Sequence, residues 1–96
     1  GDKDDLLPTS IGLLNSFPNP FNPSSIISFY LDVPQIIDVS IHDIQGHKIK
    51  NLANGFHNKG SHQIQWNPEK SISSGIYVVT LKTNNSLLNH KILYLK

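Results

Sequence analysis

The chain has 96 residues and a mass of 10.7 kDa, which suits one domain with one hydrophobic core. Its net charge of +1 is too small to favour nucleic acid or an anionic membrane surface. No stretch of the sequence approaches the ~20 consecutive apolar residues that cross a bilayer. All eight basic residues are lysines, so bidentate arginine contacts with phosphate or guanine are excluded.

The composition favours an all-β fold. Ala53 and Glu69 are the only alanine and the only glutamate, so residues that form helices well are scarce. Short runs rich in Ile, Val, Phe and Tyr are separated by Pro, Gly and Asn. This spacing of short strands and turns is typical of a β-sandwich or barrel, and no stretch keeps a helical period.

Alternation of apolar and polar side chains predicts the strands. Ile27, Phe29 and Leu31 share one face of the clearest strand. Residues 75–82 are largely apolar on both faces, which predicts a place in the middle of a sheet, whereas 53–60 is expected to be a loop. The expected strands are 11–17, 25–31, 37–43, 47–52, 61–66, 75–82 and 87–95.

The first residues differ in composition from the rest of the chain. Residues 1–8 are acidic and polar, and they lack the cationic and apolar regions of a signal peptide. We therefore expect residues 1–10 to be a linker or an expression remnant, and residues 11–96 to form the folded domain.

Side chains that could catalyse a reaction or bind a metal are present, but their spacing matches no recognised site. The chain has no cysteine, which removes disulfides, thiolate metal sites and cysteine nucleophiles. Its five histidines show no recognised metal-ligand spacing, and no serine lies in a G-x-S-x-G motif. Asp43 is expected to hydrogen-bond the backbone of its own turn. We therefore predict no catalytic residue, no metal and no cofactor, and hence not an enzyme.

The densest motif is FPNPFNPSS, residues 17–25. Each proline fixes its own φ and restrains the residue before it, so the segment is expected to be stiff and extended and unable to act as a central strand. The asparagines can close turns on the backbone, and both phenylalanines are expected to anchor the segment at the rim of the core. The residues concerned are Phe17, Pro18, Asn19, Pro20, Phe21, Asn22 and Pro23.

Two interpretations of this motif are open on the residues alone. It is a rigid crossover between the first two strands, or it is a recognition epitope, since a peptide that is already ordered loses little entropy on docking. The two interpretations are compatible with each other.

Extended to FPNPFNPSSIISFYL, the motif resembles the opening signature of the C-terminal sorting domain of the type IX (Por) secretion system, type A. The immunoglobulin-like domain of the flagellar hook-capping protein carries a similar signature. Later blocks resemble the family's D-x-x-G hairpin turn, its G-x-H-x-x-x-W stretch, its S-G-I-Y segment and its closing K-x-x-x-x-K. The matching positions include Asp43, Gly46, Gly60, Trp66, Gly75, Tyr77, Lys91 and Lys96.

The five ordered blocks cover residues 17–96, with two departures from the family pattern. The stretch 67–74 is shorter than the frequent family form and lacks its aspartate and glycine. His47 stands where arginine often follows the turn glycine. Both departures lie in loops or at exposed strand starts, so they bear on detailed contacts more than on membership.

The resemblance implies an immunoglobulin-like antiparallel β-sandwich of about seven strands at the C-terminus of a larger exported bacterial protein. It implies recognition of the folded domain by the outer-membrane translocon or shuttle of the type IX system, and removal by a sortase-like peptidase. The N-terminally fused passenger would pass through the periplasm to the cell surface or medium of a Gram-negative bacterium. The domain is expected to be a monomer that binds no nucleic acid and does not insert into a membrane.

Recognition is expected to involve residues 17–23 together with Lys91 and Lys96. The last strand is expected to offer backbone groups for strand addition to a partner. The alternative is a non-catalytic accessory module of a secreted enzyme, which binds carbohydrate or protein or acts as a spacer. Carbohydrate binding would require an exposed row of aromatic rings or a cation site, whereas Trp66 alternates with Ile64 and is expected in the core.

Overall fold

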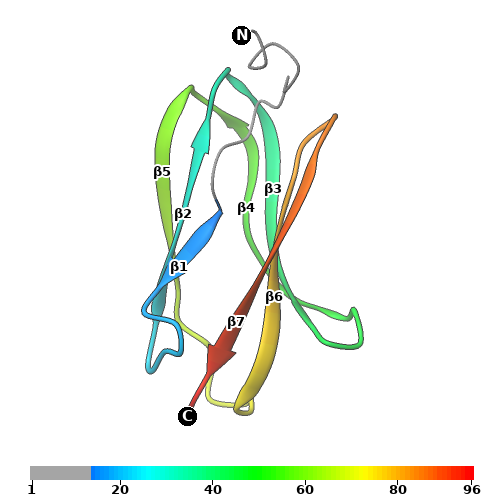
Figure 1. Ribbon diagram of the computed structural model, residues 1–96. Coiled ribbons are helices and arrows are strands. Elements are labelled where there is room, and N and C mark those ends of the chain that lie inside the picture. The colour runs from blue at the N-terminus through cyan, green and yellow to red at the C-terminus, as the bar shows by residue number, and fades with distance from the viewer. Residues whose placement is uncertain (1–13) are drawn as a thin grey trace, which may run out of the picture.

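The computed structural model describes residues 14–96 as a sandwich of two antiparallel β-sheets (Figure 1). The strand order is β1-β2-β5 in one sheet and β4-β3-β6-β7 in the other. This confirms the predicted all-β sandwich of seven strands. The strands are β1 (Asn15–Phe17), β2 (Ser25–Leu31), β3 (Gln35–Asp43), β4 (Lys48–His57), β5 (Gly60–Trp66), β6 (Gly75–Lys82) and β7 (Leu87–Tyr94). Within this part of the chain, no helix is long and apolar enough to span a membrane.

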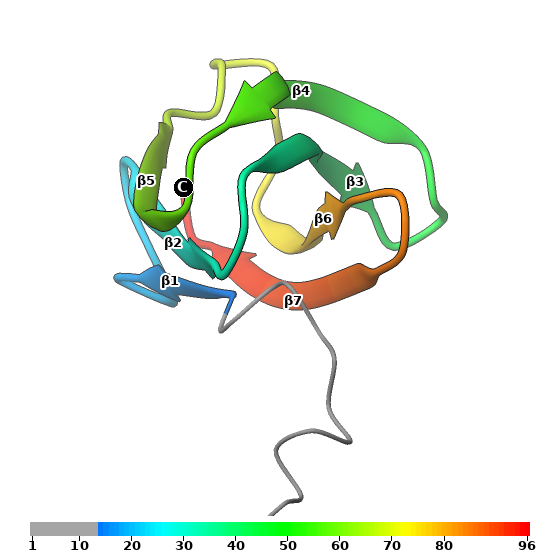
Figure 2. The same ribbon diagram turned by 90° about the horizontal axis from the view of Figure 1, so that it is seen from above.

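Figure 2 shows how the two sheets face each other and where their edges meet. The short edge strand β1 lies beside β7, an edge strand of the other sheet. The Ser16 and His90 side chains form a hydrogen bond between these two edges. At the opposite side, the chain passes from the edge strand β4 to the edge strand β5 through residues 58–59. The sandwich is therefore held at one side by this turn and at the other by contacts between β1, the segment after it, and β7.

Alternate residues of each strand point into the space between the sheets. Ile27 and Ile41 are completely buried, and their neighbours on β2 and β3 are mostly more open, as the alternation predicts. Burying a side chain of this kind contributes about 1.5–3 kcal/mol. β6 lies between β3 and β7, so its predicted central position is confirmed. The buried hydrophobic residues are Leu14, Phe21, Ile27, Phe29, Leu31, Ile37, Val39, Ile41, Trp66, Tyr77, Val79, Leu81, Ile92 and Tyr94.

An aromatic cluster fills the core at the end of β7. Trp66 is buried, as predicted, and its ring centre lies 5.4 Å from that of Phe21 and 5.6 Å from that of Tyr77. The Tyr77 hydroxyl donates a hydrogen bond to the Ser73 carbonyl at 2.7 Å. A tyrosine near the start of a strand whose hydroxyl bonds the backbone just upstream has the geometry called a tyrosine corner.

Several predicted strand ends differ from the structure, and β3 begins at Gln35 and not at residue 37. The loop expected over residues 53–60 is wrong, because β4 continues to His57 and pairs Phe56 with Ile36. β4 is an edge strand with register shifts against β3, and its asparagines and Gly55 conceal the usual alternation. β1 spans three residues, and residues 11–13 of the first expected strand lie outside the described part, as does the expected linker over residues 1–10.

We expect Tyr77→Phe to lower the free energy of unfolding by about 1–2 kcal/mol, because it leaves the Ser73 carbonyl without its donor. Urea unfolding followed by Trp66 fluorescence measures the effect. Tyr30→Phe is the matched control, since the Tyr30 ring is 42% exposed and its hydroxyl bonds no described residue. Equal losses in the two variants would show that the tyrosine corner does not stabilise the fold.

Candidate recognition surface

The proline-rich motif forms a segment, residues 17–23, that crosses from the end of β1 to the start of β2 (Figure 1). It bends at residues 18–20 and again at 22–23, so the expectation of an extended segment is wrong. Phe21 is the anchor, as predicted: only 2% of it is exposed, and its ring stacks on Tyr94 with centres 5.0 Å apart. We call residues 17–23 the signature segment.

Asn19 binds the signature segment to the edge of β7. Its side-chain Nδ2 donates a hydrogen bond to the Lys91 carbonyl at 3.1 Å, and its Oδ1 accepts one from the Leu93 amide at 2.9 Å. The expected turn between the Asn19 amide and its own backbone is therefore wrong. An amide side chain carries both a donor and an acceptor, so it takes the place of a peptide group from a neighbouring strand.

Phe21 continues this pairing with its backbone. The Phe21 amide donates to the Leu93 carbonyl at 2.9 Å, and the Leu95 amide donates to the Phe21 carbonyl at 3.0 Å. Phe21 and Tyr94 thereby form a parallel bridge. The backbone groups that strand addition would use at the end of β7 are already bonded, so a partner strand would first have to displace the signature segment.

Phe17 does not behave as predicted. The sequence suggested that it anchors the rim of the core, but it is 77% exposed and points away from the core. Along β1 the inward side chain is Ser16, because neighbouring residues in a strand face opposite sides. Phe17 sits opposite Ile26 on the outer surface of the three-stranded sheet.

Two further hydrogen bonds hold the corner where β1, β2 and β7 meet. The buried Ser25 hydroxyl donates to the Pro18 carbonyl at 2.8 Å. Ser16 Oγ and His90 Nε2 lie 2.7 Å apart in a hydrogen bond. Burial in this corner lowers the pKa of His90, because it disfavours the charged imidazolium.

The two lysines of the closing block lie in different surroundings. Lys91 is exposed on the outer surface of β7. Lys96 is tied to the connection between β5 and β6: its amide donates to Ser74 Oγ at 2.8 Å, and its Nζ donates to the Lys70 carbonyl. The structure thus brings the signature segment to Lys91, whereas Lys96 fixes the chain end elsewhere.

Asp43 and Gly46 shape the turn between β3 and β4, as the D-x-x-G pattern predicts. Asp43 Oδ1 accepts hydrogen bonds from the amides of Gln45 at 3.0 Å and His47 at 2.9 Å. These bonds, the His47 amide first, lower the pKa of the Asp43 carboxyl. Gly46 has a φ of 91°, a conformation that residues with a Cβ rarely adopt.

The remaining motif positions are structural. Gly60 opens β5 with a φ of 123° and pairs with Leu31, while Gly75 opens β6 opposite Tyr94. Trp66 and Tyr77 belong to the aromatic cluster described above. These positions set turns and packing and do not converge on a surface site.

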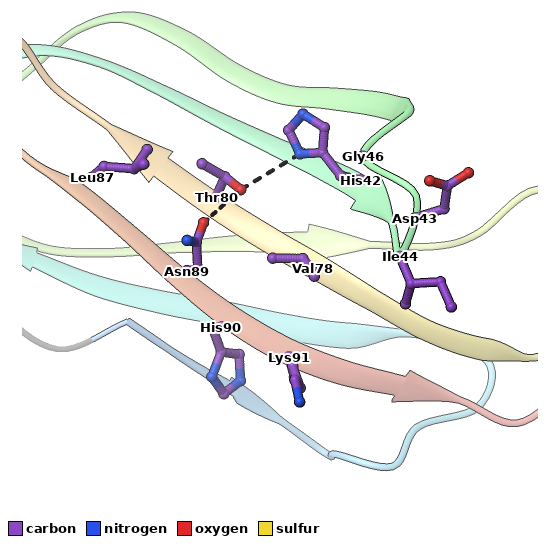
Figure 3. Close-up of a pocket in the computed structure, with 10 residues that line it drawn as sticks. All are labelled: His42, Asp43, Ile44, Gly46, Val78, Thr80, Leu87, Asn89, His90 and Lys91. Carbon is purple, nitrogen blue, oxygen red and sulfur yellow. Dashed lines mark hydrogen bonds between the residues drawn. The ribbon is translucent and has the colours of Figure 1, made fainter.

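An open groove of about 570 Å³ lies on the outer surface of β3, β6 and β7 (Figure 3). Thr80 Oγ1 donates to Asn89 Oδ1 at 3.0 Å and lies 3.5 Å from His42 Nδ1, so its hydroxyl proton is held by an amide. This is not the pairing of a nucleophile with a base. Among residues 14–96, no three His, Cys, Asp or Glu side chains gather where they could hold a metal ion.

Asn19→Ala removes both side-chain hydrogen bonds to β7 and should lower the free energy of unfolding by about 1–2 kcal/mol. The Leu93 amide should also exchange with solvent faster, which NMR hydrogen exchange resolves. Asn22→Ala is the control, because Asn22 is exposed and bonds no residue that the structure describes. An unchanged exchange rate of the Leu93 amide would show that the Asn19 side chain does not hold the signature segment on β7.

The lowered pKa of His90 gives stability a pH dependence. Between the folded pKa and the ordinary value of 6.5, the unfolded chain binds more protons at His90 than the folded domain. The free energy of unfolding should therefore fall as pH drops below about 6.5, and His90→Gln should reduce this fall. Urea unfolding at pH 8 and pH 5 compares the two proteins, and an identical fall in both would refute a role for His90.

Comparisons with known proteins agree with the order of the motifs. The protein-family model of the secretion system C-terminal sorting domain matches residues 15–94, which span every strand of the sandwich. Neither the curated proteins nor the solved structures gave a match. Because the matched region covers most of the chain, this protein belongs to the C-terminal sorting domain family of the type IX secretion system.

Proposed function

We propose that this domain is the sorting signal of a larger exported protein and that the type IX outer-membrane machinery recognises it as a folded surface. Membership of the sorting-domain family carries the proposal, because the matched region includes both the signature segment and β7. Type IX sorting directs proteins through that system to the cell surface or medium. The part assigned to this chain is recognition, without a chemical step of its own.

The opening and closing motifs of the family meet in the folded domain, and this favours recognition of the folded state. Asn19 and Lys91 are 72 positions apart, yet a hydrogen bond joins them. A receptor that contacts both therefore reads a surface that exists only after folding. Such a surface is ordered before binding, so it loses little conformational entropy on docking, and it is independent of the passenger's sequence.

Within the signature segment, the residues divide into two groups. Asn19 and Phe21 bond and pack against β7, and they hold the segment in place. The other side chains of the segment face solvent and are available to a receptor. These exposed residues are Phe17, Pro18, Pro20, Asn22 and Pro23.

The proposal extends to the fate of the passenger. A passenger fused before residue 1 would cross the periplasm and reach the surface of a Gram-negative cell with this domain attached. The translocon or shuttle would bind the domain, and a sortase-like peptidase would cut within residues 1–10. The passenger would then be anchored or released while the sandwich is removed.

A reporter fusion tests this function. An exported fluorescent protein carrying this chain at its C-terminus should reach the surface or medium of a bacterium with the type IX system, and should stay in the periplasm of a translocon mutant. Mass spectrometry of the exported reporter should locate the cut within residues 1–10. Periplasmic retention in the intact strain would reject the proposed function.

Point variants separate recognition from folding better than truncation does. Deleting residues 91–96 removes Ile92 and Tyr94 from the core, so loss of export would follow from unfolding alone. Lys91→Ala leaves the core intact and should lower export if this side chain is read by the receptor. Lys82→Ala is the matched control, because Lys82 is likewise exposed on the outer surface of the same sheet.

A further inference from the structure

Within residues 14–96, no charged side chain lies at an outward position of the three-stranded sheet. Its outward positions on β1, β2 and β5, all within the described part of the chain, hold only amides, hydroxyls, an isoleucine and two aromatic rings. We call this surface the neutral face. Its residues are Asn15, Phe17, Ile26, Ser28, Tyr30, Ser61, Gln63 and Gln65.

The other outer surface of the sandwich is different in charge. On the four-stranded sheet, Asp38 pairs with Lys82 across β3 and β6, and Lys91 lies opposite Val78 on the next strand. Lys48 and His42 face each other at the β3–β4 end of the same sheet. Among the strand residues that the structure describes, lysines thus lie on the outer surface of the four-stranded sheet and not on that of the three-stranded sheet.

The polar groups of the two surfaces also differ in how they are bonded. On the charged surface the polar groups bond one another. Asn51 Nδ2 donates to Ser40 Oγ at 3.0 Å and also to Asp38 Oδ1, and Thr80 donates to Asn89. On the neutral face, a shallow hollow of about 250 Å³ is lined by Asn15, Ser28, Tyr30, Ser61 and Gln63 among others.

Four polar side chains that line the hollow have no partner within residues 14–96, whereas Gln65 on the same face donates to Ser24 Oγ and Asn67 Oδ1. The side chains of Ser28, Tyr30, Ser61 and Gln63 make no hydrogen bond with any residue in the range 14–96. A docking partner can therefore bond their donors and acceptors without breaking a hydrogen bond to any of residues 14–96.

Phe17 projects from this face with 77% of its surface exposed. It belongs to the signature segment, yet the fold uses the neighbouring Ser16, Asn19 and Phe21 and leaves the Phe17 ring in solvent. A large aromatic ring exposed beside an uncharged flat surface is the usual form of an interface anchor, which fills a pocket on a partner.

We propose that the neutral face, anchored by Phe17, is the surface through which this domain docks on an uncharged surface of a protein in the type IX outer-membrane machinery. This inference rests on the proposed function and assigns the contact to the neutral face and not to Lys91, so it predicts that Lys91→Ala is exported as well as Lys82→Ala. The partner surface should offer an apolar pocket for the Phe17 ring and neutral hydrogen-bonding groups opposite Ser28 and Gln63. It should carry few charges, since an unpaired charge buried against this face would lose its hydration.

A protein fits this face better than a polysaccharide does. A sugar chain stacks on rings that form a continuous row. Here Tyr30 is four residues beyond Ile26, the residue opposite Phe17, so the two rings stand about 13 Å apart along the sheet with Ser28 between them. One projecting ring with a flat neutral surround suits insertion into a protein pocket.

An uncharged interface makes a specific prediction about salt. Screening weakens contacts between exposed charges, because the Debye length falls from about 10 Å at 0.1 M to about 3 Å at 1 M. Binding through the neutral face should therefore change little with ionic strength. Binding through Lys48, Lys82 and Lys91 on the other surface should weaken strongly.

The test titrates the fluorescently labelled chain against detergent-solubilised outer membranes from a type IX bacterium and from its translocon mutant. Wild type should bind only the first, with an affinity that changes less than about threefold between 0.05 and 0.5 M salt. Phe17→Ala should bind roughly 10- to 30-fold more weakly, the effect of removing an anchor ring. Gln63→Lys, which places a charge on the face, should also bind more weakly.

The charged surface supplies matched controls. Phe56 is 64% exposed and pairs with Ile36 as Phe17 pairs with Ile26, so Phe56→Ala should bind like wild type. Asn54→Lys adds a charge to the same surface and should also have no effect. Because all these positions are exposed, urea unfolding should show unchanged stability, and the same variants in the reporter fusion should rank export in the same order.

The outcomes distinguish this inference from the proposed sorting function on which it rests. If the wild-type fusion is not exported, the proposed function fails and this inference fails with it. If wild type binds and is exported but Phe17→Ala and Gln63→Lys match it, the neutral face is not the docking surface. Equal losses in Phe56→Ala, binding that collapses in 0.5 M salt, or Phe17-dependent binding to a neutral glucan in place of the membrane protein would each overturn it too.

Discussion

The contact between the Asn19 side chain and the edge of β7 is the constraint on which the rest of this surface depends. Pro18 and Pro20 flank Asn19, and neither has an amide hydrogen, so the backbone there cannot form a regular ladder with a neighbouring strand. The Asn19 amide supplies the missing donor and acceptor, and the Phe21 backbone continues the pairing. The prolines prevent this segment from being a regular strand, but they do not prevent it from covering the edge of β7.

Covering this edge has two consequences for the domain. An edge strand with open backbone groups invites pairing with other chains, and the signature segment bonds those groups at Leu93 and Leu95. The same bonds join the two sheets at the corner where the sheets would otherwise meet only through side chains such as Ser16 and His90. The signature segment is thus a rigid crossover that also forms part of an ordered surface, and its interpretation as a recognition epitope stays a proposal.

The sequence predicted those features that depend on neighbours along the chain. Alternation placed β2, and an apolar run placed β6, at their observed ends. The D-x-x-G turn predicted the bonds of Asp43 to its own backbone. It failed where the deciding partner is distant. The bonds of Asn19 run to residues more than 70 positions away, and Phe17 faces outward because Ser16 faces the corner with His90, which no local pattern contains. β4 was cut short because its polar outward residues and bulged register hide the period.

The difference between the two outer surfaces is not a requirement of folding. Outward positions on β1, β2 and β5 face solvent, where replacing a serine or glutamine by lysine changes stability little. Lysine is tolerated at such positions on the four-stranded sheet, as Lys48, Lys82 and Lys91 show. Packing therefore does not explain why one surface is neutral while the other carries lysines. A partner that buries this surface, as proposed above, would account for the difference, because a lysine buried there would lose its hydration.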